Sequence, residues 1–531
     1  MRRVIFFIGV PLKFLQVQGY KYNVFIKTML ADDSFARSHP SRFTTFVHIN
    51  SHKMIRRLQQ LEKAARELEP AAGKRKKTRD KVVAYGEDFL NRIENLKAYD
   101  YTEDKGIGLL DSPVSEEPLT IDQVLDLLKS NVDTHGLNPA SGGYLGFIPG
   151  GGIYYSALGD YLADVTNRLA ALFFGSPGAV RMENMMIAWL AGILGFPETA
   201  AGNLTSGGSI ANLIAVVTAR DAKGIGSQMI PKSVIYLSQQ THHSVQKAIR
   251  IAGLNECILR YVGMDAGYRM KADELENAIR QDKENGLNPF LVVSSAGTTD
   301  VGAVDPLERI GDIAAANGLW FHVDAAYGGF FILTAEGKIK LGGIEKADSV
   351  CIDPHKGMFL PYGLGAVIVK DMSSLRNSHY YLASYLQDAQ GESDEISPSD
   401  LSPELTKHFR GLRFWLPLKL LGTKPFVAAL EEKLLLAKYF YGEIKKLGFE
   451  TACEPELSVV TYRWIPKTGN ADDFNKRLAE EVVKDGRVFI SSTILDGKFT
   501  LRLAILSFRT HLKTIRLTLE ILREKVEMLE G

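Results

Sequence analysis

At residues 319–329 the chain reads Leu-Trp-Phe-His-Val-Asp-Ala-Ala-Tyr-Gly-Gly, a short apolar run that ends in an aspartate and a glycine pair. We interpret 319–323 as a buried strand, because short runs rich in β-branched and aromatic residues are typical of sheet cores. Similar runs occur at 233–237, 290–294 and 366–369, with helical patterns between them at 209–222, 244–253, 272–283 and 307–317. This alternation predicts an α/β fold with a mostly parallel central sheet covered on both faces.

The flanking segments divide the rest of the chain. Residues 409–531 predict a small α+β domain, with helices at 417–447, 471–484 and 511–529 and strands at 457–464, 487–492 and 499–505. An acidic, Pro- and Ser-bearing stretch before it is typical of a mobile loop. We expect five parts: an extension of uncertain order at 1–53, a helical N-terminal segment at 54–139, the large domain at 140–386, the loop at 387–408, and a long helix with the small C-terminal domain at 409–531.

Composition and charge exclude several classes of protein. Of the 531 residues, 45% are apolar and 24% are charged, which is typical of a soluble globular protein. The net charge of +1 gives no electrostatic argument for a nucleic acid or an anionic membrane as partner. The three cysteines, Cys257, Cys351 and Cys453, share no CxxC spacing. We therefore expect neither a disulfide framework nor a metal site, and a reducing, cytoplasmic compartment.

The strongest local motif is Asp353-Pro-His-Lys-Gly357, which places Lys356 in a glycine-flanked turn close to an apolar strand. Partial desolvation there would lower the pKa of the lysine and free its amine to form an imine. Taken alone, the motif is modest evidence, because a lysine in a turn is more often a surface residue than a catalytic one. Its neighbours in the chain must decide between the two interpretations.

Asp324 directly follows the predicted strand 319–323, so we expect it at the carboxyl end of that strand, where open α/β sheets bind their ligands. A buried aspartate is costly unless it is paired. A protonated pyridine nitrogen would be such a partner, and the pairing would let a cofactor ring accept electrons. The alternative role for Asp324 is to cap the following helix.

The stretch Gly202-Asn-Leu-Thr-Ser-Gly-Gly-Ser209 opens a predicted helix, so its backbone N–H groups could bind an anion. Gly202 and Gly207 have the separation found in a P-loop, but Gly208 replaces the lysine that a P-loop requires, which excludes an NTPase. We expect a phosphate site here, with a plain glycine turn as the alternative.

Five motifs together resemble the group II pyridoxal-phosphate (PLP)-dependent decarboxylases, which include the aromatic-L-amino-acid, glutamate and histidine decarboxylases. They are Thr205-Ser-Gly-Gly-Ser-Ile-Ala-Asn212, Thr241-His-His-Ser-Val-Gln-Lys247, Gly297-Thr-Thr299, His322-Val-Asp-Ala-Ala-Tyr327 and Asp353-Pro-His-Lys356. Their order and spacing match over about residues 110–525. The resemblance implies the PLP-dependent transferase fold of type I, a homodimer whose active sites are built from both chains, and PLP as the cofactor.

The resemblance also implies a role for each matched residue. Lys356 would hold PLP as a Schiff base, and Asp324 would pair with the pyridinium nitrogen. His242 would stack on one face of the ring, although a histidine at this position could also be a plain surface residue. The other predicted cofactor-binding residues are Ala326 against the second ring face, Gly207, Gly208, Ser209 and His355 at the phosphate, Asp353 close by, and Thr298 near the ring.

A tyrosine on a mobile loop delivers a proton to Cα in these decarboxylases. The ungapped match falls on Tyr385, and Tyr381 offers the same Tyr-Leu dipeptide four residues earlier. Relatives with phenylalanine here tend towards aldehyde formation, so a tyrosine favours plain decarboxylation. Either tyrosine could instead serve only for packing.

We therefore expect PLP-dependent α-decarboxylation of an L-amino acid to an amine and carbon dioxide. The alternatives are an aldehyde synthase or another carbon–carbon lyase on the same scaffold, and a non-catalytic PLP-fold binding protein. The stretch 142–152 resembles the substrate-side loop of the family, but Gly150 stands where aromatic decarboxylases usually have a hydroxyl residue. Ala171 stands where they tend to have phenylalanine. For this reason an aromatic substrate is not carried over.

Overall fold

The computed structural model describes residues 40–148, 150–381 and 395–531. The chain divides into two compact units, Met1–Ala84 and Tyr85–Gly531. The first contains α3 (Pro40–Ala65) and the beginning of α4 (Ala72–Arg92). Most of the predicted extension, and residues 387–394 of the predicted loop, lie outside the described residues. In the part of the chain that is described, no helix has both the length and the apolar character needed to cross a membrane.

The second unit is built on a seven-stranded sheet. Its order is β3 (Ala201–Thr205), β9 (Gly365–Val369), β8 (Ser349–Ile352), β7 (Trp320–Asp324), β6 (Asn288–Ser295), β4 (Ser233–Leu237) and β5 (Ile258–Tyr261). Strand β9 is antiparallel to both of its neighbours, and the other pairs are parallel. The predicted α/β fold with a mostly parallel sheet is confirmed.

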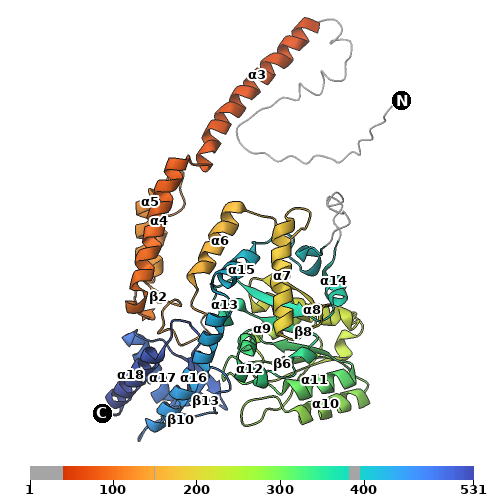
Figure 1. Ribbon diagram of the computed structural model, residues 1–531, viewed down its shortest axis with the longest axis vertical. Helices are drawn as coiled ribbons and strands as arrows, with labels where there is room; N and C mark the ends of the chain where they lie inside the picture. The colour runs from red at the N-terminus through yellow and green to blue at the C-terminus, as the bar shows by residue number, and fades with distance from the viewer. Residues whose placement is uncertain (1–39, 149, 382–394) are drawn as a thin grey trace. The chain divides into compact units, whose positions relative to one another are not determined.

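Helices cover both faces of this sheet, and the pleat decides which side chain meets which helix (Figure 1). Val234 and Tyr236 belong to one apolar core, and Ile235 and Leu237 belong to the other. Because both faces are buried, the strands read as continuous apolar runs rather than as alternating patterns. The first core includes α7 (Pro177–Ile193), α10 (Ala272–Glu284) and α11 (Leu307–Asn317), and the second includes α8 (Gly208–Ala222), α9 (His243–Ile251) and α14 (Met372–His379).

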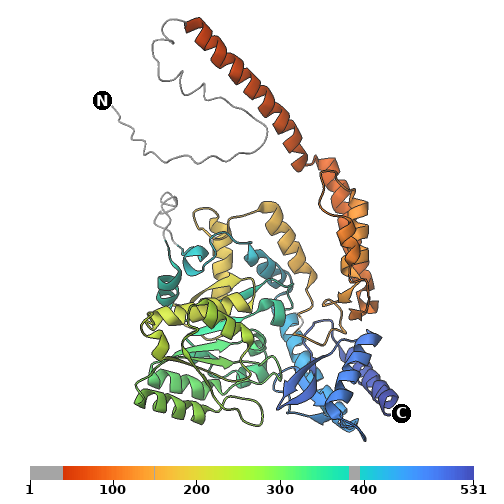
Figure 2. The same ribbon diagram turned by 180° about the vertical axis from the view of Figure 1, so that it is seen from behind.

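The C-terminal region forms a second sheet beside the first, seen in blue from behind in Figure 2. This antiparallel sheet has the order β10 (Glu450–Thr451), β11 (Val459–Arg463), β13 (Lys498–Ala504) and β12 (Ser491–Leu495). Its apolar core is shared with three helices: α16 (Lys424–Lys446), α17 (Ala471–Asp485) and α18 (Leu512–Glu530). A small α+β arrangement is therefore present where the sequence predicts one.

Two predicted elements of this region are wrong in their bounds. The single helix predicted at 417–447 is two helices, α15 (Arg410–Leu421) and α16, because the backbone of Gly422 turns to φ +67°, which breaks the helix. The strand predicted at 487–492 begins only at Ser491. Ahead of it, the backbone of Phe489 instead bonds to Gly143 and Leu145, in the loop 142–152.

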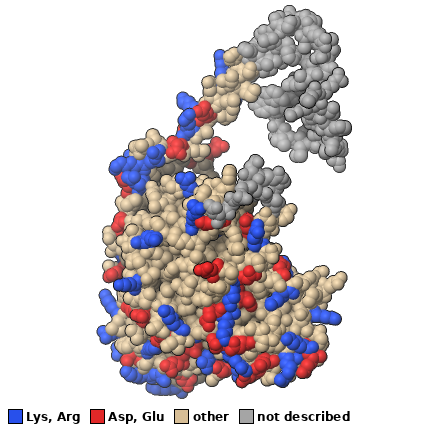
Figure 3. Space-filling model, turned by 45° about the vertical axis from the view of Figure 1, so that its right-hand side comes forward, with Lys and Arg blue, Asp and Glu red and all other residues tan. Residues whose placement is uncertain are grey.

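Acidic and basic side chains are interspersed over the visible face of the Tyr85–Gly531 unit in Figure 3. No extended area of a single sign stands out on that face, as expected from a net charge of +1.

Candidate active site

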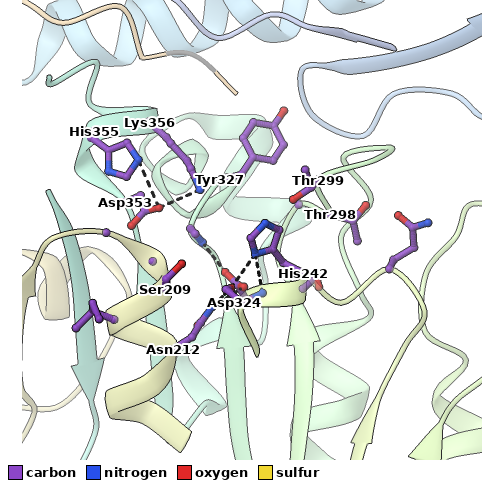
Figure 4. A pocket seen from close by; sticks show the side chains of 18 of the residues that line it. Ser209, Asn212, His242, Thr298, Thr299, Asp324, Tyr327, Asp353, His355 and Lys356 are labelled. Atoms are coloured by element: carbon purple, nitrogen blue, oxygen red, sulfur yellow. Dashed lines mark hydrogen bonds and ion pairs between the residues drawn. The ribbon is translucent and has the colours of Figure 1, made fainter. Parts of the chain in front are cut away.

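Strands β4, β6, β7 and β8 are parallel, so their carboxyl ends lie at one edge of the sheet. A cavity of about 270 Å³ lies at this edge (Figure 4). Tyr385 lies outside the described residues, and Tyr381 is 89% exposed. The other ten residues predicted for the site all line the cavity: Gly207, Gly208, Ser209, His242, Thr298, Asp324, Ala326, Asp353, His355 and Lys356.

Lys356 lies in α13 (Pro354–Gly357), a single helical turn after β8. Its Nζ donates a hydrogen bond to Asp353 Oδ2 at 2.9 Å, and Figure 4 shows Lys356 and His355 both directed towards Asp353. The expected lowering of the Lys356 pKa is wrong for the free protein. Burial lowers this pKa, but the charge and the hydrogen bond of Asp353 outweigh burial and raise it above its usual value. The amine must therefore lose a proton before it can act as a nucleophile.

Asp324 is the last residue of β7 and is only 7% exposed. Its Oδ2 accepts a hydrogen bond from Nδ2 of Asn212 at 2.9 Å, and its Oδ1 accepts one from the backbone N–H of Ala326 at 3.1 Å. These two donors compensate for the burial of the carboxylate. The Asp324 carboxylate therefore lines the cavity at the end of a strand, and two hydrogen bonds hold it in place.

His242 is the residue that caps the N-terminus of α9. Its Nδ1 lies 2.7 Å from Oγ of Ser244 and 3.3 Å from the backbone nitrogen of the same residue. Burial lowers the pKa of His242 below its usual value, although the negative charge of Asp324 acts in the opposite direction. The imidazole is therefore neutral at neutral pH. The neighbouring His243 is close, with 4.1 Å between the ring centroids.

The turn between β3 and α8 is formed by Gly207, Gly208 and Ser209, where the first N–H groups of the helix have no partner within the helix. A Cβ at Gly208 would lie 3.0 Å from Asp353 Oδ2, so no larger residue fits without displacing that carboxylate. A Cβ at Gly207 would lie 3.7 Å from Cε1 of His355. This corner therefore combines the first N–H groups of α8 with an imidazole, which suits a phosphate.

A buried network that we did not predict lies behind Asp324. His322 Nε2 is 2.9 Å from Oδ1 of Asn212, and His322 Nδ1 is 2.9 Å from Oγ of Ser349. The indole N–H of Trp320 donates to the same Ser349 oxygen at 2.8 Å. Burial lowers the pKa of His322 to about 4, so this histidine is neutral. Asn212 lies in the quoted motif 205–212, but its partner Asp324 is 112 residues away, a contact that only the fold creates.

The small domain holds the loop 142–152 against the cavity. Arg502 of β13 donates from Nη1 to the carbonyl oxygen of Gly146 at 2.6 Å and from Nε to that of Thr299, which lines the cavity, at 2.7 Å. Arg509 donates to the carbonyl oxygen of Gly151 at 2.6 Å. Arg502 was not among the predicted site residues. An arginine between two leucines of an apolar strand was the signal that could have revealed it.

Gly150 occupies a close approach between this loop and α13. A Cβ at this position would collide with the carbonyl oxygen of His355, so the loop and α13 meet backbone to backbone here. Ala171, the second departure from the aromatic decarboxylases, is fully buried, and its carbonyl oxygen accepts the N–H of Ser399. Residue 150 therefore cannot carry a hydroxyl side chain with the backbone in this position.

These residues fit PLP on observations of the structure itself. The cavity combines a lysine amine, a buried carboxylate and a glycine turn at a helix N-terminus, which match the aldehyde, the ring nitrogen and the phosphate of that cofactor. The family model for the pyridoxal-dependent decarboxylase conserved domain matches residues 104–465. The chain belongs to this decarboxylase family.

Individual relatives agree with the family match. An aromatic-L-amino-acid decarboxylase from Bacillus atrophaeus is 32% identical over 433 residues, covering 80% of this chain and 89% of that protein. A phenylacetaldehyde synthase from Arabidopsis thaliana is 30% identical over 467 residues, covering 84% of this chain and 95% of that protein. The crystal structure of Oryza sativa TDC with PLP and tryptamine superposes with a TM-score of 0.82 at 25% sequence identity. The match covers 87% of this chain and 99% of that chain. The decarboxylase is a PLP-dependent carboxy-lyase acting on an amino acid.

We predict that Gly208→Val lowers the affinity of the decarboxylase for PLP by about tenfold or more, because the new side chain meets Asp353 and overpacking costs about 1–3 kcal/mol. Equilibrium dialysis against PLP measures this affinity. Gly226→Ala is the matched control, since a Cβ there has no heavy atom within 4 Å. An unchanged affinity in Gly208→Val would contradict the predicted placement of the phosphate.

We predict that His322 makes the protein less stable in acid. Its pKa is about 4 when folded and 6.5 as the reference value, so the unfolded chain binds the proton first. The contribution of His322 to the free energy of unfolding is therefore fully present above about pH 6.5. It is lost as the pH falls towards 4, and the loss is about 3 kcal/mol. Thermal midpoints of the wild type and His322→Gln at pH 7 and 4.5 measure the effect. Between pH 7 and 4.5 the thermal midpoint of the variant should fall less than that of the wild type, and an equal fall in both would refute the prediction.

Proposed function

We propose that Lys356 binds PLP covalently and that Asp324 holds the proton on its ring nitrogen in this decarboxylase. The observation that carries the proposal is that an amine and a buried carboxylate, placed at the ends of the neighbouring strands β8 and β7, line the same cavity. Decarboxylation through PLP needs both groups, because one anchors the cofactor and the other makes its ring an electron acceptor.

When bound, PLP supplies an aldehyde for amines and a ring that accepts the electron pair left as the carboxylate departs. Asp324 keeps a proton at the ring nitrogen, with its own carboxylate held by Asn212 and by the backbone of Ala326. His242 covers one ring face and Ala326 the other, which excludes water from the reacting centre. Thr298 lies near the ring, fixed by its bonds to the backbone of Ala303.

The phosphate is held by Gly207, Gly208 and Ser209 at the start of α8 and by His355. The Nδ1–H of His355 donates to the carbonyl oxygen of Leu364 at 2.6 Å, which leaves Nε2 on the side of Asp353, 3.8 Å from Oδ2. Asp353 also positions Lys356, and it would hold the lysine amine whenever that amine is not bound to the cofactor.

We propose Tyr385 as the residue that returns a proton to Cα of the substrate after carbon dioxide leaves. Its support is the ungapped match of the sequence and the preference of aldehyde-forming relatives for phenylalanine. Tyr381 is the alternative, with its side chain 89% exposed. The substrate is an L-amino acid and the product is the corresponding amine.

Lys356→Ala should abolish turnover, because no other amine can replace a covalent anchor placed 2.9 Å from Asp353. Purified holoenzyme is offered a panel of common amino acids, and carbon dioxide and amine are measured. Borohydride reduction followed by peptide mapping should label residue 356 alone, and Lys232→Ala, at an exposed lysine, should behave as wild type. Turnover by Lys356→Ala would overturn the proposal, and aldehyde with ammonia and peroxide would indicate an aldehyde synthase.

We also propose that the decarboxylase is a homodimer through α6 (Tyr154–Thr166). The small face of this helix packs on α15, where a Cβ at Gly159 would lie 2.8 Å from the carbonyl oxygen of Leu412. The opposite face exposes apolar side chains at helical spacing: Tyr154, Tyr155, Leu158, Tyr161, Leu162 and Val165. A contiguous apolar patch of this kind marks a protein interface.

Leu162→Asp should convert the dimer to a monomer, because it places a charge within an interface that must be desolvated. Light scattering after size exclusion measures the molar mass. The same substitution at Leu435, an exposed leucine on α16, is the matched control and should leave the dimer intact. A monomeric wild type, or a dimeric Leu162→Asp variant, would refute the proposed interface.

We propose a reducing, cytoplasmic compartment for this enzyme. Its support is that Cys257, Cys351 and Cys453 are all free thiols, of which the first two are buried.

A further inference from the structure

A continuous chain of hydrogen bonds connects Asp324 to His242 without a direct contact between them. Nδ2 of Asn212 donates one hydrogen to Asp324 Oδ2 at 2.9 Å and the other to Oγ of Ser244 at 3.0 Å. Oγ of Ser244 lies 2.7 Å from Nδ1 of His242. Figure 4 shows Asn212, Asp324 and His242 close together on one side of the cavity.

The carboxylate of Asp324 sets the direction of the hydrogen bonds that Asn212 and His322 make. As a carboxylate, Asp324 can only accept, so Asn212 must turn its NH₂ group towards it and its carbonyl towards His322. His322 must then carry its proton on Nε2 and accept at Nδ1 from Ser349. At the far end, the indole N–H of Trp320 can only donate, and it occupies the other side of the Ser349 hydroxyl. The Trp320 end is compatible with the direction that the carboxylate of Asp324 sets.

The donors around Nδ1 of His242 fix the position of its proton in the same way. Ser244 Oγ accepts from Asn212, so its O–H is available to donate to Nδ1 of His242. The backbone N–H of Ser244 points at the same nitrogen at 3.3 Å. With two donors facing it, Nδ1 is unprotonated. The single proton of the neutral imidazole is then on Nε2, and the opposite tautomer would leave buried donors unsatisfied, at a cost of about 1–3 kcal/mol for each.

We propose that Asn212 is a positioning residue that couples the carboxylate of Asp324 to the tautomer of His242. Through Asn212 and Ser244, the carboxylate of Asp324 fixes His242 as a neutral hydrogen-bond donor at Nε2. One buried charge thereby sets two groups of the site at once. The charged and titratable groups that act on His242 are Asp324, Asp353, Lys356 and His243.

The test is a nitrogen-15 NMR measurement of the His242 tautomer, made on the protein without cofactor so that the result does not depend on catalysis. His242→Gln assigns the signal among the 11 histidines. In the wild type we expect an unprotonated Nδ1 and a protonated Nε2. In Asn212→Leu, which keeps the volume but removes both donors, we expect a mixture of the two tautomers. Asp324→Asn should give a mixture as well, because the obligatory acceptor is lost.

Two further variants make the test specific. Ser244→Ala removes only the link between Asn212 and His242, and it serves as the second test should Asn212→Leu not fold. Thr218→Val is the matched control on α8: Thr218 is fully buried but bonds to Ile214 and to His379, so only the His379 signal should move. In the loaded enzyme, Asn212→Leu should lower kcat by about tenfold with little change in KM, as when an imidazole loses its orienting partner.

The outcomes separate cleanly. A mixture of His242 tautomers in Asn212→Leu and Ser244→Ala, together with the wild-type tautomer in Thr218→Val, supports the coupling. An Nε2–H tautomer that persists undiminished in both folded variants overturns it, because the backbone N–H of Ser244 would then be sufficient alone. Neither outcome changes if Lys356 proves not to anchor PLP, so a failure of the proposed function remains distinguishable.

Discussion

The carboxylate of Asp324 is buried at the end of a parallel strand, where an unpaired charge would be costly. Two hydrogen-bond donors compensate for this burial: the side-chain amide of Asn212 on α8 and a backbone N–H in the turn after β7. The amide of Asn212 is in turn held by His322 and Ser244, so the packing of α8 on the sheet is tied to the acid. The position of the whole cofactor pocket depends on this arrangement, since the same helix begins at the glycine turn proposed for the phosphate.

The small domain is hydrogen-bonded to segments next to the site. Arg502 and Arg509 extend from the C-terminal region to backbone carbonyls of the loop 142–152 and of Thr299. These bonds fix the loop close to α13, where Gly150 leaves no room for a side chain. The small domain therefore fixes the loop that resembles the substrate-side loop of the family, while the ends of the strands carry the groups proposed to hold the cofactor.

Sequence patterns predicted the sheet well because burial on both faces makes each strand a plain apolar run. The predicted strand 233–237 is β4 to the residue, and the helix 307–317 is α11. The failures have local causes: Gly422 breaks a continuous helical pattern, and the backbone of Phe489 bonds to the loop 142–152 instead of extending β12. The predicted lowering of the Lys356 pKa failed because desolvation was weighed without the ion pair to Asp353.

The chemical groups of the site were already present in the sequence as types and spacings. A lysine, a strand-ending aspartate and a glycine turn before a helix are local features, and local features can be recognised from neighbouring residues alone. The bonds between those groups were decided only by the tertiary structure. Asn212 and Asp324 are 112 residues apart, and Arg502 is 203 residues from Thr299. Such contacts depend on how helices and strands pack, because a hydrogen bond acts only within about 3 Å and no pattern along the chain encodes that distance.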